Sequence, residues 1–243
     1  MLRDADAAAT RAKALGGARV EVFDERIRSD AVALLELEDD LRRGLDAGEL
    51  VVHHQPVVTL EGQVVGFEAL VRWQHPTRGL VSPARFVPVA EQTGLVLPLG
   101  RAVLDLALGQ LATWRRERPE ALDWTMAVNL SGRQLTEPGL VDEVSDALSR
   151  HQVEPSSLRL ELTETLLMSD DPQVDDAIAG LRDLGVHLSV DDFGTGYSSL
   201  VYLRRFPVDV LKLDRVFVQG AAAHEVDRAI VGSMIALARA LGM

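Results

Sequence analysis

The stretch LSVDDFGTGYSSL, residues 188–200, contains the most informative feature of this sequence, an acidic pair at the end of a strand-like run. An apolar run ends in two adjacent carboxylates, Asp191 and Asp192, and the glycines Gly194 and Gly196 follow them. Neighbouring carboxylates repel each other, so a folded chain that keeps both ionised must hold a cation against them or leave them in water. Polar residues at the ends of other strand-like runs help to decide between these outcomes.

The chain around this stretch alternates short strand-like runs with amphipathic helices. Two expected strands at 51–58 and 64–73 are joined by a short turn and should form a hairpin. Further expected strands are WTMAVNL (124–130), LRLELTE (158–164), VHLSVDDF (186–193) and VDVLKLD (208–214). Apolar residues at helical spacing predict helices at 99–117, 138–151, 172–184, 197–205 and 224–241. The pattern predicts a parallel sheet covered by helices, either doubly wound or closed into a barrel.

The positions of polar residues within these strands favour the barrel. In a β/α barrel, the chemistry is carried by residues at the carboxyl ends of several strands, whereas an open sheet concentrates its site at one switch point. Five of the expected strands carry a polar residue in or near the C-terminal half. These residues are Glu68, Asn129, Glu161, Asp191, Asp192, Lys212 and Asp214.

Composition excludes several classes of protein. The 243 residues are 47% hydrophobic, include no cysteine and carry a formal net charge of −12. A chain without cysteine has no disulfide, thiolate metal site or cysteine nucleophile, which agrees with a reducing, cytoplasmic setting. The negative charge disfavours extended nucleic acid as a partner. We expect no direct membrane insertion, because no apolar run reaches the length of a membrane span. We expect no signal peptide, because the N-terminus carries charges where the apolar region of a signal peptide would lie.

The polar strand residues form a coherent set of ligands for hard cations. A single acid in a strand can be an edge position, a helix cap or half of an ion pair. Four carboxylates and one asparagine amide at one barrel end instead predict Mg²⁺ or Mn²⁺, and the adjacent pair Asp191 and Asp192 could serve two ions. Lys212 would position or activate a water, although a structural pairing with Asp209 or Asp214 is the alternative. Arg72 lies on the same side of its strand as Glu68 and suits a phosphate.

Six ordered segments closely resemble those of EAL-domain phosphodiesterases, which hydrolyse cyclic di-GMP to linear pGpG. They are FEALVRW, QHPTRGLVSPARFVPVAEQTG, VNLSGRQL, LELTET, VDDFGTGYSSL and LKLD, between residues 67 and 214. The resemblance implies a TIM-like (β/α) barrel whose first strand is antiparallel. It also implies cyclic di-GMP as ligand, bacterial second-messenger signalling and two divalent metal ions.

The resemblance assigns a role to each matching residue. Glu68, Asn129, Glu161 and Asp191 resemble the ligands of one metal ion, and Asp191 with Asp192 those of the second. Lys212 resembles the catalytic lysine, and the resemblance implies that Glu68 and Glu164 are catalytic with it. Glu164 resembles the glutamate that anchors the DDFGTG loop. Expected substrate contacts are Gln55, Leu70, Arg72 and Asp214.

The two ends of the chain depart from this pattern. Residues 1–25 resemble the closing helix and strand of a GGDEF-like domain, yet carry no GG(D/E)EF signature, so no cyclase activity is expected. Residues 26–49 are expected to form a helical linker and the start of the EAL domain, and residues 50–243 a barrel incomplete after its sixth βα unit. Upstream GGDEF-like and sensory domains in a parent protein are expected partners, and a homodimer is compatible with the sequence.

Three functions are compatible with these observations. The first is a metal-dependent cyclic di-GMP phosphodiesterase. It is favoured because every metal ligand of the family that falls within the part of the chain covered by the resemblance is present. The second is a non-hydrolytic cyclic di-GMP receptor or regulatory module, or an inactive truncated fragment. The third is a β/α domain whose acidic rim binds nothing.

Overall fold

The structure is a computed structural model that describes residues 25–168, 170–194, 203 and 205–243. The chain divides into two compact units: Met1–Glu49 with Trp73–Leu95, and Leu50–Arg72 with Val96–Met243. The segment 1–25, for which a GGDEF-like remnant was predicted, lies outside the described residues except for its last position. Most of the helix predicted at 197–205 also lies outside them.

The first unit contains two helices and the end of a strand pair. Helix α2 (Glu25–Asp46) occupies most of the stretch predicted as a linker helix, and α3 spans Pro83–Thr93. The last residues of β2 (Val64–His75) pair antiparallel with β3 (Gly79–Val81), with Trp73 opposite Val81. Trp73 is completely buried and its indole N–H donates to Glu49 Oε2 at 2.9 Å. A buried indole with a satisfied N–H gives this unit its own small core.

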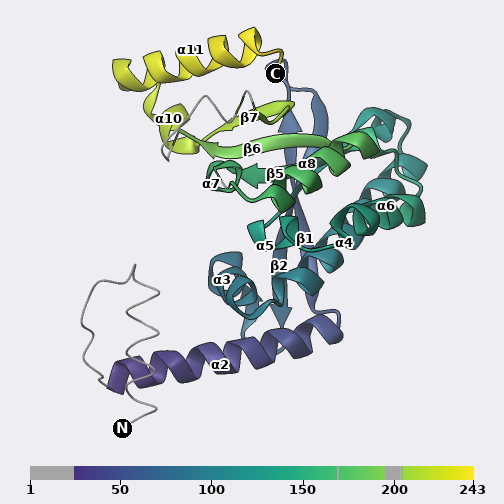
Figure 1. Cartoon of the computed structure of the whole chain (residues 1–243), viewed down its shortest axis with the longest axis vertical. Coiled ribbons are helices and arrows are strands. Elements are labelled where there is room, and N and C mark those ends of the chain that lie inside the picture. Colours follow the sequence, from purple (N-terminus) through teal and green to yellow (C-terminus); the bar gives the residue numbers. More distant parts are fainter. Residues whose placement is uncertain (1–24, 169, 195–202, 204) are drawn as a thin grey trace. The chain divides into compact units, whose positions relative to one another are not determined.

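The second unit is built on a sheet with the strand order β1-β2-β4-β5-β6-β7 (Figure 1). Its strands are β1 (Leu50–Val58), β2, β4 (Thr125–Asn129), β5 (Leu158–Thr163), β6 (His187–Phe193) and β7 (Val210–Leu213). From β2 to β7 each neighbouring pair runs parallel, as predicted. The turn between β1 and β2 is closed by the Thr59 N–H, which donates to the Gln63 carbonyl at 2.8 Å. Over the described residues the sheet is open, with β1 and β7 at its ends.

Helices connect successive parallel strands up to β7, as the alternation in the sequence predicts, and two more helices follow β7. They are α4 (Val96–Glu117), α5 (Gly132–Leu135), α6 (Leu140–His151), α7 (Glu164–Leu167), α8 (Pro172–Leu184), α10 (Arg215–Gly220) and α11 (Glu225–Ala240), with short 3₁₀ turns at Pro119–Asp123 and Pro155–Ser157. The start of α8 shows why the sequence folds locally in this way. Asp171 accepts from the Gln173 N–H at 3.0 Å and Pro172 takes the first helical position, which suits the fixed φ of proline.

The core of this unit lies between the parallel strands and helices α4, α6 and α8. Leu158, Leu160 and Leu162 of β5 are almost wholly buried, as are Leu108 and Leu111 of α4. By length and composition alone α4 could cross a membrane, which corrects the expectation that no apolar run is long enough. The buried leucines instead make α4 a core helix, since its apolar side is covered by the protein.

Candidate active site

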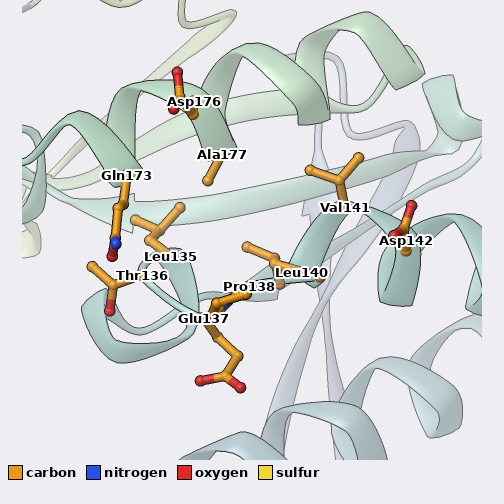
Figure 2. A pocket seen from close by; sticks show the side chains of 11 residues that line it. Leu135, Thr136, Glu137, Pro138, Leu140, Val141, Asp142, Gln173, Asp176 and Ala177 are labelled. Carbon is orange, nitrogen blue, oxygen red and sulfur yellow. The ribbon is translucent and has the colours of Figure 1, made fainter.

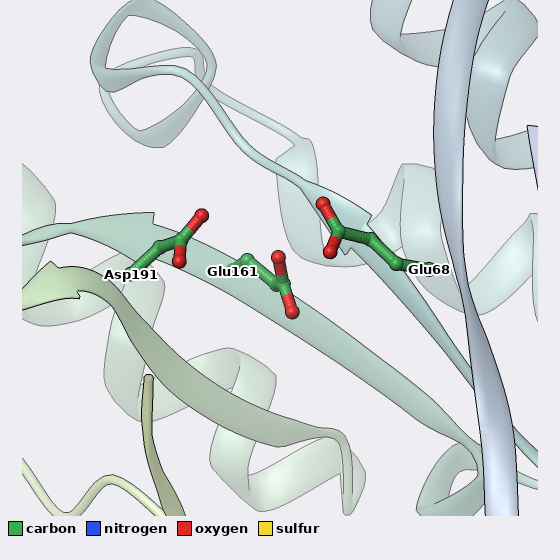
Figure 3. Close-up of side chains that lie close together, drawn as sticks. All are labelled: Glu68, Glu161 and Asp191. Carbon is green, nitrogen blue, oxygen red and sulfur yellow. The ribbon is translucent and has the colours of Figure 1, made fainter. Parts of the chain in front are cut away.

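Three carboxylates from three strands come together at the end of the sheet towards which its parallel strands run. Glu68 of β2, Glu161 of β5 and Asp191 of β6 each place an oxygen within 4.8 Å of the others (Figure 3). The parallel register explains the meeting, because Asn129 lies opposite Glu161 and Thr163 lies opposite Asp191. Parallel strands bring their carboxyl ends to one edge, so residues more than 100 positions apart share one site.

Lys212 of β7 lies among these three carboxylates. Its Nζ is 3.1 Å from Glu68 Oε2 and 3.2 Å from Asp191 Oδ1, and it also donates to Glu161 Oε2. Burial alone would lower the pKa of Lys212, but the hydrogen bond to Glu161 and the three negative charges raise it above the ordinary value. The structural alternative for this lysine, a pairing with Asp209 or Asp214, is not what these contacts show.

Glu161 is the most buried member of the cluster, with 3% of its surface exposed. Burial raises the pKa of Glu161 to about 7, and the hydrogen bond and charge of Lys212 act in the opposite direction. Buried carboxylates need a cation nearby to stay ionised. In this cluster the cation of the protein itself is the Lys212 ammonium.

Glu68 is held from two sides. Asn129, the last residue of β4, donates its Nδ2 to Glu68 Oε1 at 3.0 Å, and Lys212 donates to the other oxygen at 3.1 Å. The amide oxygen of Asn129 is not used in this bond and could serve, beside the carboxylates, as a further oxygen ligand for a metal ion. The structure thus brings together Glu68, Asn129, Glu161, Asp191 and Lys212.

Asp192 lies in a β-bulge that the sequence analysis did not identify. Val190 pairs with Leu211 and Phe193 pairs with Leu213, so both Asp191 and Asp192 face the single residue Lys212 across the ladder. Asp192 has a φ of 55°, in the left-handed region that aspartate tolerates better than most residues. Burial, the charge of Asp191 and the charge of Asp214 raise the pKa of Asp192. A regular strand would send adjacent side chains to opposite faces, whereas a bulge can re-aim one of them.

The remaining predicted site residues lie on neighbouring elements. Glu164 begins α7 and is 7% exposed. Its Oε2 accepts from the N–H of Gly194, two residues after Asp192, at 3.1 Å. Residues 195 and 196, the rest of the DDFGTG segment, lie outside the described residues. Asp214 caps α10, accepting from the Val216 N–H at 2.7 Å.

The predicted substrate contacts on the first two strands are accessible to different degrees. Gln55 is exposed on β1, whereas Leu70 and Arg72 are half-buried on β2 at two-residue steps from Glu68. Arg72 donates through Nη1 to the Val71 carbonyl at 2.8 Å. These positions are compatible with the predicted contacts.

A separate hollow of about 340 Å³ lies beside the loop between α5 and α6 and the first turns of α8 (Figure 2). Leucine and alanine side chains line it together with the acids Glu137, Asp142 and Asp176, whose carboxylates point in different directions (Figure 2). Acids spread in this way do not make a ligand set for one ion. The carboxylate cluster around Lys212 is therefore the stronger candidate site.

Fold and cluster together define a β/α protein with an all-oxygen ligand set at the carboxyl ends of its parallel strands. Three carboxylates whose oxygens lie within 4.8 Å, with an asparagine amide beside them, fit a hard divalent cation better than zinc. The family model described as the EAL domain matches residues 38–243, and this chain belongs to that family.

Two characterised bacterial proteins are similar along the whole chain. This chain is 44% identical over 244 residues to the bifunctional diguanylate cyclase/cyclic di-GMP phosphodiesterase MucR of Pseudomonas aeruginosa. The alignment covers 100% of this chain and 35% of MucR. The chain is 38% identical over 243 residues to the cyclic di-GMP phosphodiesterase PdeR of Escherichia coli, covering 100% of this chain and 36% of PdeR. The chain therefore spans about a third of the length of these relatives.

A solved structure of the MucR phosphodiesterase in complex with cyclic di-GMP has the same fold. The TM-score is 0.79 at 46% identity, over 86% of this chain and 84% of that one. This similarity and the family membership confirm the predicted fold class, the TIM-like (β/α) barrel of the EAL type, of which the described residues form an open sheet.

Proposed function

We propose that this chain hydrolyses cyclic di-GMP to linear pGpG with the help of two divalent metal ions, Mg²⁺ or Mn²⁺. The observation that carries the proposal is the meeting of Glu68, Glu161 and Asp191 around Lys212 at the barrel end where β/α barrel enzymes hold their chemistry. Similarity to MucR and PdeR, both named as cyclic di-GMP phosphodiesterases, supports the choice of substrate.

Each residue of the cluster has a task in this proposal. Glu68, Asn129, Glu161 and Asp191 would hold one ion, and Asp191 with Asp192 the other. When bound, such ions polarise the phosphate and lower the pKa of a coordinated water. Lys212 would orient that water by hydrogen bonding. Water adds to phosphorus, the bond from phosphorus to one ribose 3′ oxygen breaks, and the departing oxygen takes up a proton, which opens the ring to the linear dinucleotide.

The surrounding residues bind the substrate and shape the site. Arg72 would offset the negative charge of a phosphate, because a guanidinium offers several N–H donors to its oxygens. Gln55, Leu70 and Asp214 would contact the rest of the ligand. Glu164 would hold the start of the loop after Asp192 through the Gly194 N–H.

The decisive experiment is incubation of purified protein with cyclic di-GMP and either Mg²⁺ or Mn²⁺, followed by identification of the product by mass. We expect pGpG. Glu68→Ala and Asp191→Ala should each lower turnover by at least about a thousandfold, because metal binding supplies several kcal/mol of transition-state stabilisation.

A matched control is Asp142→Ala at the separate hollow, which should leave turnover within about twofold since surface changes away from the site rarely matter. Unchanged cyclic di-GMP that nevertheless binds to the protein would contradict hydrolysis and identify a receptor instead. Retention of more than about a tenth of the activity in Glu68→Ala or Asp191→Ala would remove these residues from the metal site.

A further inference from the structure

Strand β7 has to place Lys212 in a specific register, although it is only four residues long. Before the bulge just two pairs align it with β6, Ser189 with Val210 and Val190 with Leu211. A slip of one residue would turn every side chain of β7 to the opposite face of the sheet and remove Lys212 from the carboxylates. Something outside the short ladder must therefore fix the register.

Asp209, the residue before β7, is bonded to Leu188 of β6 in both directions. The Asp209 N–H donates to the Leu188 carbonyl at 2.8 Å, and the Leu188 N–H donates to Asp209 Oδ2 at 2.8 Å. A bond from a backbone N–H to a carboxylate is shorter and stronger than one between neutral groups. Because both bonds join the same two residues, a slip of β7 against β6 would break both.

The Asp209 carboxylate is also anchored to helix α8. Arg182 donates through Nη1 to both carboxylate oxygens at 2.8 Å, and His187 Nδ1 lies 3.3 Å from Oδ2. Burial would raise the pKa of Asp209, but the Leu188 N–H, Arg182 and His187 together hold it below its usual value. The carboxylate therefore stays ionised and joins β6, the start of β7 and α8.

We propose that Asp209 is a positioning residue for Lys212, which fixes the register of β7 and thereby delivers the ammonium group to Glu68, Glu161 and Asp191. Asp209 lies three residues before Lys212 and bonds to β6 three residues before Asp191. Arg182 completes the arrangement from α8. The catalytic part of this inference rests on the proposed hydrolysis of cyclic di-GMP, and the structural part does not.

The chain offers a closely matched control in Asp105. Asp105 of α4 also pairs with one arginine and one histidine, Arg150 and His151, the latter at 2.9 Å. These partners lie on α6, so Asp105 joins two helices and has no part in the register of β7. Both Asp209→Asn and Asp105→Asn therefore remove a structural ion pair. Only Asp209→Asn also weakens the connection between β6 and β7.

The first test compares kinetic constants in the full-length protein. An asparagine at 209 must turn its NH₂ group towards either Arg182 or the Leu188 N–H, so one donor faces another. We expect Asp209→Asn to lower kcat about 10- to 100-fold with KM within about twofold, because a misplacement near 1 Å has an effect of this size. Asp105→Asn should leave both constants within about twofold. Equal kinetic effects of the two variants would overturn the proposal.

A double-mutant cycle separates positioning from a general loss of structure. If Asp209 acts through Lys212, Asp209→Asn added to Lys212→Ala should lower kcat by less than about twofold further, because the group it positions is gone. A full additional loss would overturn the proposal. Should Asp209→Asn fail to fold, Arg182→Gln replaces it in both tests and should lower kcat by a smaller factor, because it removes the anchor on α8 and leaves the bonds to Leu188; an unchanged kcat would overturn the role given to that anchor.

Hydrogen exchange tests the structural part without any activity. We expect faster exchange of amides in β6 and β7 in Asp209→Asn than in the unaltered protein, and no such change in Asp105→Asn. An inactive unaltered protein would contradict the proposed function alone, whereas unchanged exchange in Asp209→Asn would contradict the positioning role.

Discussion

At the scale of single residues, the site depends on a balance of charge around Lys212. Three carboxylates surround one ammonium group, so the cluster carries excess negative charge even with the lysine in place. Charges in a partly buried site interact more strongly than in water, and this excess favours the binding of further cations. Lys212 alone therefore does not neutralise the carboxylates around it.

Lys212 and Arg72 should differ in their kinetic roles. Lys212 touches the carboxylate cluster, whereas Arg72 lies at the edge of the same strand face as Glu68 and donates to a backbone carbonyl. We expect Lys212→Ala to lower kcat about 100-fold or more with little change in substrate affinity, and Arg72→Ala to raise KM as well. Steady-state kinetics with cyclic di-GMP, together with equilibrium binding of the ligand, measure both effects. Identical kinetic profiles for the two variants would refute this division of roles.

At the scale of elements, the close approach of β2 and β4 determines where Glu68 lies. Gly66 of β2 pairs with Thr125 of β4, and a Cβ at Gly66 would lie 2.5 Å from the Thr125 carbonyl oxygen. This neighbour is backbone in a sheet and cannot move aside as a flexible side chain could. Because Gly66 has no side chain, β2 can lie close to β4 two residues before Glu68, the acid that belongs to the cluster.

Gly66→Ala should destabilise the fold by about 1–3 kcal/mol, since it forces an overpacked contact between two strands. It should also lower turnover, because Glu68 moves with β2. Gly232→Ala is the control: a Cβ there meets nothing within 4 Å, and in the interior of α11 alanine should stabilise by up to about 1 kcal/mol. Denaturant unfolding measures both. A Gly66→Ala protein as stable as the unaltered one would show that the strands can separate without cost.

The packing of β1 on α4 should make stability dependent on pH. His54 of β1 packs edge-on against Trp114 of α4, with ring centroids 4.9 Å apart. Within the described part of the chain its buried Nε2 has no hydrogen-bond partner. Burial, and then the charge of His53, lower the pKa of His54 below 6.5. The folded chain therefore disfavours the protonated ring.

The stability that results is fully present above the unfolded pKa of about 6.5 and is lost as the pH falls through the lower folded pKa. His54→Phe keeps an aromatic ring and removes the titration, so its unfolding midpoint should fall less between pH 7.5 and 5.5. His224→Gln, at an exposed helix cap, is the control and should keep the pH dependence of the unaltered protein. An unchanged pH dependence in His54→Phe would exclude His54 as its source.

At the scale of the whole molecule, the net charge of −12 restricts the ligands that can bind. Affinity for polynucleotides comes largely from cations that neutralise many phosphates, and this chain presents a repulsive mean field to them. A small cyclic dinucleotide has few phosphates, which a metal site and one arginine can neutralise. The net charge therefore disfavours long polyanions more than the small cyclic dinucleotide that we propose as substrate.

We expect no binding of long single-stranded RNA at near-physiological salt, with any Kd weaker than about 10⁻⁴ M. Cyclic di-GMP should bind under the same conditions. Both can be measured by fluorescence anisotropy with Lys212→Ala, in which hydrolysis is slow and binding is expected to persist. Micromolar RNA binding would show that a basic surface outweighs the net charge.

The fold class, and the polar residues that lie together at one end of the sheet, could be predicted from the sequence. Strand periodicity, interrupted near the strand ends by Glu68, Asn129, Glu161, Asp191 and Lys212, was sufficient to predict that these side chains share one end of a β/α sheet. This works because the direction of side chains along a strand and the common polarity of parallel strands are local rules. The family assignment followed from the same segments.

The partners of each charged group, in contrast, become visible only in the folded chain. Nothing in the sequence shows that Asp191 and Asp192 form a bulge opposite Lys212, or that Lys212 bonds to three acids instead of Asp209. The sequence suggests Asp209 as a partner for Lys212, whereas its carboxylate bonds to the Leu188 N–H and to Arg182. The physical reason is that register and ion pairing depend on distances between strands that are far apart in the chain, and no local rule of spacing contains those distances.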